Sequence, residues 1–69
     1  MALFAEDQGL ALSTQLLSQA RARRAPAVVL EIGAGQGREL IARAESMGWA
    51  RVTCAQDFAG HDRVLMALG

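Results

Sequence analysis

Apolar residues recur along the chain with two different periods, and each period predicts a different kind of element. Over Leu10–Arg24 they recur every three or four positions, which is typical of a helix with one buried face. Asp7 is a candidate N-terminal cap for this helix, and Pro26 ends it by restricting the residue before it. The same spacing predicts a second helix over Arg38–Met47, with Gly48 as its C-terminal cap residue.

Three short segments have the pattern of β-strands. Ala27–Ile32 is almost continuously apolar, which is typical of a strand buried on both faces. Arg51–Ala55 alternates polar and apolar residues, and Arg63–Leu68 is mainly apolar. We expect the first two strands to be parallel, with a right-handed crossover through the second helix, and the last two to form an antiparallel hairpin around the Gln56–Asp62 loop. The chain is therefore predicted to be α/β, ordered helix-strand-helix-strand-strand, with a mixed sheet.

Composition limits the classes of protein to be considered. The chain has 69 residues, of which 52% are hydrophobic and 20% charged, so it has room for one small domain. Seven acidic and seven basic residues cancel, which argues against a strongly basic nucleic-acid-binding protein. No apolar run approaches the roughly 20 residues of a membrane span, and one cysteine forms neither an internal disulfide nor a metal cluster. We expect a cytoplasmic location and neither a nucleic-acid nor a membrane partner.

One stretch has the pattern of a ligand-binding loop. The Glu31-x-Gly33-x-Gly35-x-Gly37 pattern follows a predicted strand and opens a helix, where an anionic ligand group is favoured. Asp57, about 20 residues further on, is placed to hold ribose hydroxyls. The pattern resembles the cofactor loop of S-adenosylmethionine-dependent methyltransferases. One hypothesis is therefore an opening β-α-β unit of such an enzyme, with these five residues at the cofactor.

The segment after Asp57 does not suit an opening unit. Such a unit continues into another crossover helix, whereas here a short loop leads to an apolar strand. That arrangement fits the closing hairpin of a sheet. The opening-unit hypothesis also requires that Val52 and Val64 do not lie on adjacent antiparallel strands.

Three segments resemble, in order, motifs of the HemK family, the peptide-chain release factor glutamine methyltransferases. Ala2–Leu10 resembles the family's A-L-x-G-G-x-D-G-L segment, which follows its catalytic motif. Leu30–Gln36 resembles the L-E-I-G-x-x-Q segment at the end of the fifth strand, and Asp57–Val64 resembles the closing D-x-x-G-x-x-R-V segment. Gly48 and Trp49 stand where the family usually has glycine and an aromatic residue. Within the first segment, Ala5 and Gln8 depart from the family pattern.

The resemblance implies a fold and a reaction. Family members transfer a methyl group from S-adenosylmethionine to the side-chain amide of the glutamine in the Gly-Gly-Gln loop of release factors, which act in translation termination. Their fold is a seven-stranded, class I (Rossmann-like) methyltransferase sheet behind a helical amino-terminal domain. The cofactor loop lies at the first strand, and an Asn-Pro-Pro-Tyr motif follows the fourth.

This chain contains neither the helical domain nor the Asn-Pro-Pro-Tyr motif. The resemblance therefore implies the carboxy-terminal part of the methyltransferase domain over residues 1–69, comprising strands five to seven and the preceding helix. We expect this part to be inactive alone and to bind no S-adenosylmethionine. On this interpretation no catalytic or cofactor-binding residue is assigned, and Gly33–Gly37 only looks like a cofactor loop. Release factors are partners of the full-length enzyme.

A third hypothesis is a non-enzymatic α/β module that dimerises. In the fragment interpretation the strand at Ala27–Ile32 lacks its neighbour, the fourth strand. An open apolar strand edge pairs readily with another chain. We therefore expect the isolated chain to self-associate through this edge or to fold poorly.

Single residues in the loops have mainly structural interpretations. Glu31 is expected to orient the loop that follows it, or to help shape a pocket at the strand end. Asp57 and Arg63 are expected to form an ion pair that brackets the hairpin loop, with Gly60 supplying a positive φ. His61 has no nucleophile that can be assigned to it, so a catalytic role is not expected.

The remaining candidates are expected to lie in the core or at a helix start. Cys54 is interpreted as a small buried apolar residue, and Trp49 as a seal for the corner between helix and strand. Met47 and Met66 are expected in the core. Gln36 is expected at an exposed helix start.

Overall fold

Two helices and three strands make up the computed structural model, which describes residues 6–69. The elements are α1 (Glu6–Ala22), β1 (Ala27–Glu31), α2 (Gly37–Ser46), β2 (Arg51–Gln56) and β3 (Asp62–Leu68). Their order confirms the predicted α/β sequence of helix, strand, helix, strand, strand. Residues 2–5 of the segment that resembles the family's A-L-x-G-G-x-D-G-L motif, including Ala5, lie outside the described residues. Neither described helix is long and apolar enough to cross a membrane.

The three strands form one antiparallel sheet in the order β1-β3-β2. β2 and β3 form the predicted antiparallel hairpin, in which Thr53 lies opposite Met66. On its other side β3 pairs with β1, where Val29 lies opposite the same Met66. β1 and β2 run in the same direction but are separated by β3. The predicted mixed sheet is therefore wrong, because the long apolar last strand takes the central position and is antiparallel to both neighbours.

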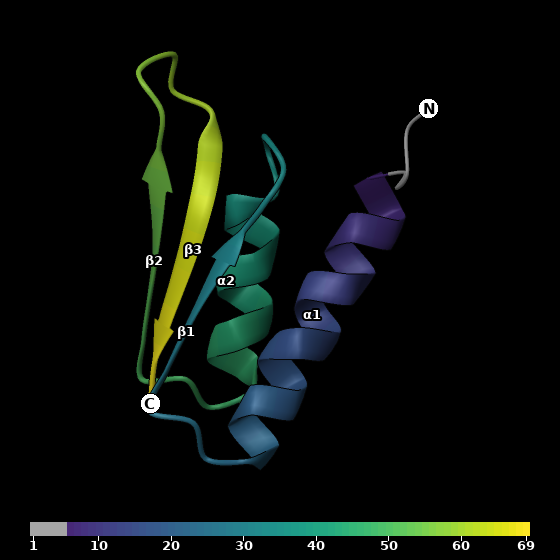
Figure 1. Cartoon of the computed structure of the whole chain (residues 1–69), viewed down its shortest axis with the longest axis vertical. Helices are drawn as coiled ribbons and strands as arrows, with labels where there is room; N and C mark the ends of the chain where they lie inside the picture. Colours follow the sequence, from purple (N-terminus) through teal and green to yellow (C-terminus); the bar gives the residue numbers. More distant parts are fainter. Residues whose placement is uncertain (1–5) are drawn as a thin grey trace.

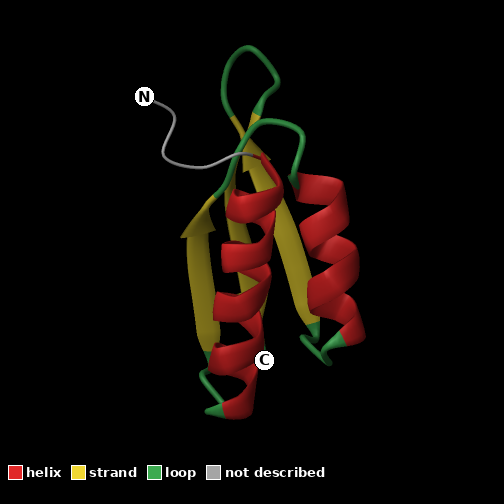
Figure 2. Cartoon of the chain, turned by 90° about the vertical axis from the view of Figure 1, so that its right-hand side faces the viewer, coloured by secondary structure: helices red, strands yellow, loops and turns green. Residues whose placement is uncertain are grey.

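Both helices lie on the same side of the sheet (Figures 1 and 2). Exposure alternates along β1 as a consequence, since Val28 and Leu30 face the helices and Val29 lies 62% exposed on the other face. The prediction that this strand is buried on both faces is wrong. Its residues are apolar on both sides, but helices cover only one of them.

The core lies between this helix layer and the covered face of the sheet. Among residues 9–69, its buried apolar members are Leu17, Ile32, Leu40, Ala44, Trp49, Leu65 and Ala67. Met47 packs against them, as predicted. Met66 does not, because it lies on the uncovered face with 41% of its surface exposed.

Trp49 closes the corner between α2 and β2, as predicted. Its ring is buried, and its Nε1–H donates a hydrogen bond to the carbonyl oxygen of Leu17 over 3.3 Å. The guanidinium of Arg21 lies 5.9 Å from the ring centroid, within cation–π distance. The indole therefore ties α1 to the start of β2.

The helix ends differ in detail from those expected. α1 begins at Glu6, so Asp7 lies inside the helix and is not its cap. α2 begins at Gly37, with Gln36 as its N-cap residue. Gly48 follows α2 with a φ of 101°, which confirms its predicted role in ending that helix.

Candidate functional site

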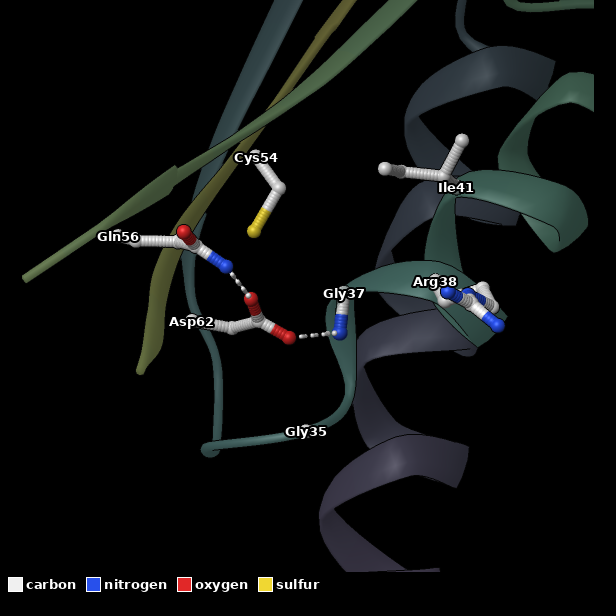
Figure 3. Close-up of a pocket in the computed structure, with 7 residues that line it drawn as sticks. All are labelled: Gly35, Gly37, Arg38, Ile41, Cys54, Gln56 and Asp62. Carbon is white, nitrogen blue, oxygen red and sulfur yellow. Dashed lines mark hydrogen bonds between the residues drawn. The ribbon is translucent and has the colours of Figure 1, made fainter. Parts of the chain in front are cut away.

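An open cavity lies where the N-terminus of α2 meets the hairpin end of β2 and β3. Its volume is about 490 Å³. The lining residues come from the glycine loop, α2 and the two hairpin strands: Gly35, Gly37, Arg38, Ile41, Cys54, Gln56 and Asp62. Figure 3 shows Asp62 between Gln56 and the first residue of α2. The cavity is thus the place where the glycine loop and the closing hairpin meet.

Asp62 occupies the N-terminus of α2. Its Oδ2 accepts a hydrogen bond from the Gly37 N–H over 2.9 Å, and its Oδ1 accepts one from Gln56 Nε2 over 3.0 Å. The Gln56 amide holds the pKa of the Asp62 carboxyl below its usual range, and the Gly37 N–H acts in the same direction. A helix N-terminus favours an anion. Here the anion is a carboxylate of the chain itself.

Glycine at position 37 leaves room for this contact. A Cβ atom there would lie 2.8 Å from Asp62 Oδ2 and 2.8 Å from Cys54 Sγ, both shorter than van der Waals contact. The missing side chain lets the carboxylate approach the backbone of α2. The third glycine of the motif therefore serves an internal contact between helix and hairpin.

Cys54 is half-buried on β2, less buried than predicted. Desolvation raises the pKa of the Cys54 thiol, and the charge of the neighbouring Asp62 raises it further. A raised pKa lowers the fraction of thiolate, which is the nucleophilic form of cysteine.

The side chain of Gln36 closes the glycine loop by a hydrogen bond within the loop. The Gly33 N–H donates a hydrogen bond to Gln36 Oε1 over 2.9 Å, and the Gln36 N–H donates one to the carbonyl of Gly33. Gly35 has a φ of 82°, which a residue with a side chain rarely adopts. These contacts make the segment a tight strand-to-helix turn.

Asp57 is engaged within the hairpin loop. Its Oδ1 accepts hydrogen bonds from the backbone N–H groups of Ala59 and His61, each over 2.9 Å. Its Oδ2 accepts one from Arg63 Nε over 2.9 Å, which confirms the predicted ion pair. Gly60 has the predicted positive φ, at 84°. The His61 N–H contributes most to lowering the pKa of Asp57, and Arg63 also lowers it.

Only two of the five residues of the cofactor hypothesis line the cavity. Gly35 and Gly37 line the cavity, whereas Glu31 is exposed at the end of β1 and Asp57 is held by its own loop. The hypothesis also fails its topological requirement, because β2 and β3, which carry Val52 and Val64, are adjacent and antiparallel.

Sequence reasoning missed Asp62 and Gln56. They were the two ends of the predicted hairpin loop, and the structure pairs them directly across the hairpin. A shift in register at Ala55 and Gln56 accompanies this pairing. The signal available was the hairpin itself, which places its flanking residues opposite each other.

Family models, curated proteins and solved structures were compared with this chain, and none of them matches.

Proposed function

We propose that this chain is the carboxy-terminal part of a release factor glutamine methyltransferase. In the whole enzyme it completes the methyltransferase sheet and supports the active site from behind. The substrate of that enzyme is the glutamine of the Gly-Gly-Gln loop in a release factor. The chain alone transfers no methyl group, and its location is cytoplasmic.

The observation that carries this proposal is the position of β3. β3 is antiparallel to both neighbours and lies between them. If β1, β2 and β3 are the fifth, sixth and seventh strands, their spatial order becomes five, seven, six. The hairpin then closes one end of the sheet and leaves β1 as the free edge. That is the edge on which the resemblance expects the fourth strand.

The uncovered face of the sheet also supports the proposal. Val29 and Met66 face each other across β1 and β3 on the side without helices, with 62% and 41% of their surfaces exposed. Contiguous exposed apolar residues mark surfaces that pack against another layer. A sheet that is one end of a larger α/β domain has such a face.

The glycine loop supports the same interpretation by its contacts. The N-terminus of α2 is filled by Asp62, so it offers no free site for an anionic cofactor group. The S-adenosylmethionine-binding site and the glutamine-binding motif therefore lie in the rest of the enzyme. Cys54 and Asp57 carry no step of the reaction.

A chimera tests this proposal. The carboxy-terminal segment of a HemK-family enzyme, from just after its Asn-Pro-Pro-Tyr motif, is replaced by residues 1–69. Methyl transfer from radiolabelled S-adenosylmethionine to a release factor is then measured, with a release factor whose Gly-Gly-Gln glutamine is changed to alanine as the substrate control. We expect the chimera to methylate the glutamine, and the truncated enzyme without any replacement to be inactive.

A matched control keeps the chimera informative. Replacing Leu65 with Asp places a charge in the core and should unfold the grafted segment, so this chimera is expected to be inactive. A wild-type chimera that melts cooperatively, binds S-adenosylmethionine and still transfers no methyl group contradicts the proposal. Methylation by the isolated chain would also contradict it.

A further inference from the structure

Within residues 6–69, β1 has a hydrogen-bonded neighbouring strand on one side only. The Ile32 N–H donates to the carbonyl of Arg63, which identifies the even-numbered positions as the ones that face β3. Backbone groups alternate between the two sides of a strand. The N–H and C=O groups of Ala27, Val29 and Glu31 therefore point to the free edge. This edge offers three donors and three acceptors to a further strand.

The other edge of the sheet is less suited to pairing. β2 carries the charged Arg51 at its start and a register shift at Ala55 and Gln56 near its end. Charged residues and bulges are the features that keep natural edge strands from pairing. The side chains of β1 are apolar from Ala27 to Leu30, and only its last residue, Glu31, is charged. Of the two edges, β1 is the one left open to a partner.

The helix layer extends beyond the β1 edge. α2 contacts both β2 and β3, whereas β1 is the only strand that α1 contacts among the described residues. Packed helices lie about 8–10 Å apart, roughly two strand spacings. α1 therefore lies over β1 and overhangs its free side, and Figure 1 shows α1 as the element farthest from β2. A strand added beside β1 would lie under α1.

α1 presents an apolar flank to this vacant position. Thr14 accepts a hydrogen bond from Arg43, and Arg21 contacts Trp49, so this flank of α1 faces α2. At about 100° per residue, Leu12 and Leu16 lie on the other flank of α1, separated from Thr14 and Arg21 by the buried Leu17. Their exposed fractions are 44% and 41%. A strand under α1 would lie on this side of the helix, with Leu16 nearer to it than Leu12.

The two ends of the edge carry opposite charges. Arg23 and Arg24 are exposed just before β1, at the end that begins with Ala27. Glu31 is exposed at the other end. An occupant with an acidic residue beside the two arginines and a basic residue beside Glu31 is complementary to this edge.

A whole second copy does not fit this position in a continuous sheet. A two-fold axis beside β1, perpendicular to the sheet, would place both copies of α1 on the same face above the same junction. Since each α1 already overhangs its own edge, the two helices would approach closer than the 8–10 Å that helix packing requires. The expectation that two whole copies pair through this edge is therefore replaced. The partner that fits is a strand that has no helix above it.

We propose that the free edge of β1 and the Leu12–Leu16 flank of α1 form a docking site for one extended polypeptide strand. The strand is apolar on the side facing α1 and acidic at the end beside Arg23 and Arg24. Main-chain hydrogen bonds to Ala27, Val29 and Glu31 hold it by β-augmentation. The site is derived from this chain alone. Under the proposed function its natural occupant is the neighbouring strand of the same enzyme.

The chain itself supplies a probe for this site. A synthetic peptide with the sequence of residues 25–33 and two additional N-terminal lysines is an extended apolar strand without α1. In antiparallel pairing its glutamate reaches the Arg23 end and its lysines reach Glu31. The peptide is titrated into the isotope-labelled 69-residue chain while amide hydrogen exchange is followed by NMR. We expect exchange at Ala27, Val29 and Glu31 to slow by at least about tenfold, while the amides already paired with β3 change little.

Two substitutions at one position separate backbone pairing from side-chain contact. Val29→Pro removes the outward N–H but no hydrogen bond to β3, whereas Val29→Thr keeps the N–H and the β-branched shape. We expect Val29→Pro to abolish peptide binding and Val29→Thr to retain it. Circular dichroism and Trp49 fluorescence report whether each variant keeps its fold. If Val29→Pro does not fold, the amide hydrogen-exchange titration of the wild-type chain alone tests the proposal.

Three results overturn the proposal. The first is a saturating peptide concentration that leaves exchange at Ala27, Val29 and Glu31 unchanged. The second is protection of these amides in the free chain that rises with chain concentration, which identifies a second copy as the occupant. The third is equal binding by a folded Val29→Pro variant. The chimera assay is independent, because methyl transfer is not measured here and the peptide takes no part in it.

Discussion

Replacing Gly37 with alanine tests whether the glycine motif serves an internal contact. Gly37 is buried, and its N–H donates to the Asp62 carboxylate over 2.9 Å. The added Cβ would lie 2.8 Å from Asp62 Oδ2 and 2.8 Å from Cys54 Sγ. Both side chains must move before the methyl group fits. The substitution therefore disturbs the junction between α2 and the hairpin.

The magnitude follows from two opposing effects. Forcing an extra methyl group into a packed site costs typically 1–3 kcal/mol. Alanine is the better helix former by up to about 1 kcal/mol in a helix interior, and by less at a first helical position. We expect a net loss of about 1–2 kcal/mol in the free energy of unfolding. For a domain of this size that corresponds to a fall in Tm of roughly 5–15 °C.

Thermal melts followed by far-ultraviolet circular dichroism measure this loss. Gly60→Ala is the matched control, because Gly60 has a positive φ and nothing within 4 Å of a Cβ atom. Its cost comes from backbone conformation alone. In a Cys54→Ala background, where one of the two close atoms is absent, the cost of Gly37→Ala should fall and that of Gly60→Ala should not.

A Gly37→Ala variant as stable as the wild type would refute this reasoning. So would an unchanged cost in the Cys54→Ala background, because it would mean that contact with Sγ does not contribute.

Three further predictions concern the cofactor, the hairpin and the core. Calorimetric titration of the isolated chain with S-adenosylmethionine should give no saturable heat, since the N-terminus of α2 is filled by Asp62; saturable binding abolished by Gly35→Val would restore the cofactor hypothesis. The native state lowers the pKa of Asp57, so the stabilisation by Asp57 is present above its unfolded pKa of about 3.9 and is lost as pH falls through the lower folded value. Asp57→Ala should therefore lower Tm at pH 7 but have little effect in strong acid, and a difference that persists in acid would contradict this. Trp49→Phe removes the hydrogen bond to Leu17 and should cost about 1–2 kcal/mol in urea unfolding; an unchanged midpoint would show that the indole N–H contributes nothing.

Local patterns predicted the elements well, because each depends on neighbours in the sequence. Helical periodicity located α1 and α2, and Gly48 ended α2 as expected. The hairpin was predictable for the same reason, since its two strands are joined by a short loop. Its ion pair between Asp57 and Arg63 followed from the loop alone.

The arrangement of the sheet was not predictable in this way. Pairing of β1 with β3 joins segments far apart in the sequence, and no local signal distinguishes it from pairing of β1 with β2. An apolar run such as Ala27–Ile32 also cannot show whether both of its faces are covered. Val29 is exposed because no element of the described chain lies on that side.

The glycines located the candidate site, but the sequence did not show which residues contact them. The pattern correctly predicted a loop between a strand and a helix, in which Gly35 has a positive φ. It could not show that Asp62, distant in the sequence, supplies the anion at the N-terminus of α2. That contact depends on the hairpin register and on the place of β3 in the middle of the sheet.

The DNA immediately upstream of the Met1 codon gives the most direct test that this chain is part of a release factor glutamine methyltransferase. The proposal predicts an upstream reading frame, intact or interrupted, that encodes Asn-Pro-Pro-Tyr within a few tens of codons. Upstream sequence that encodes no such motif would contradict it.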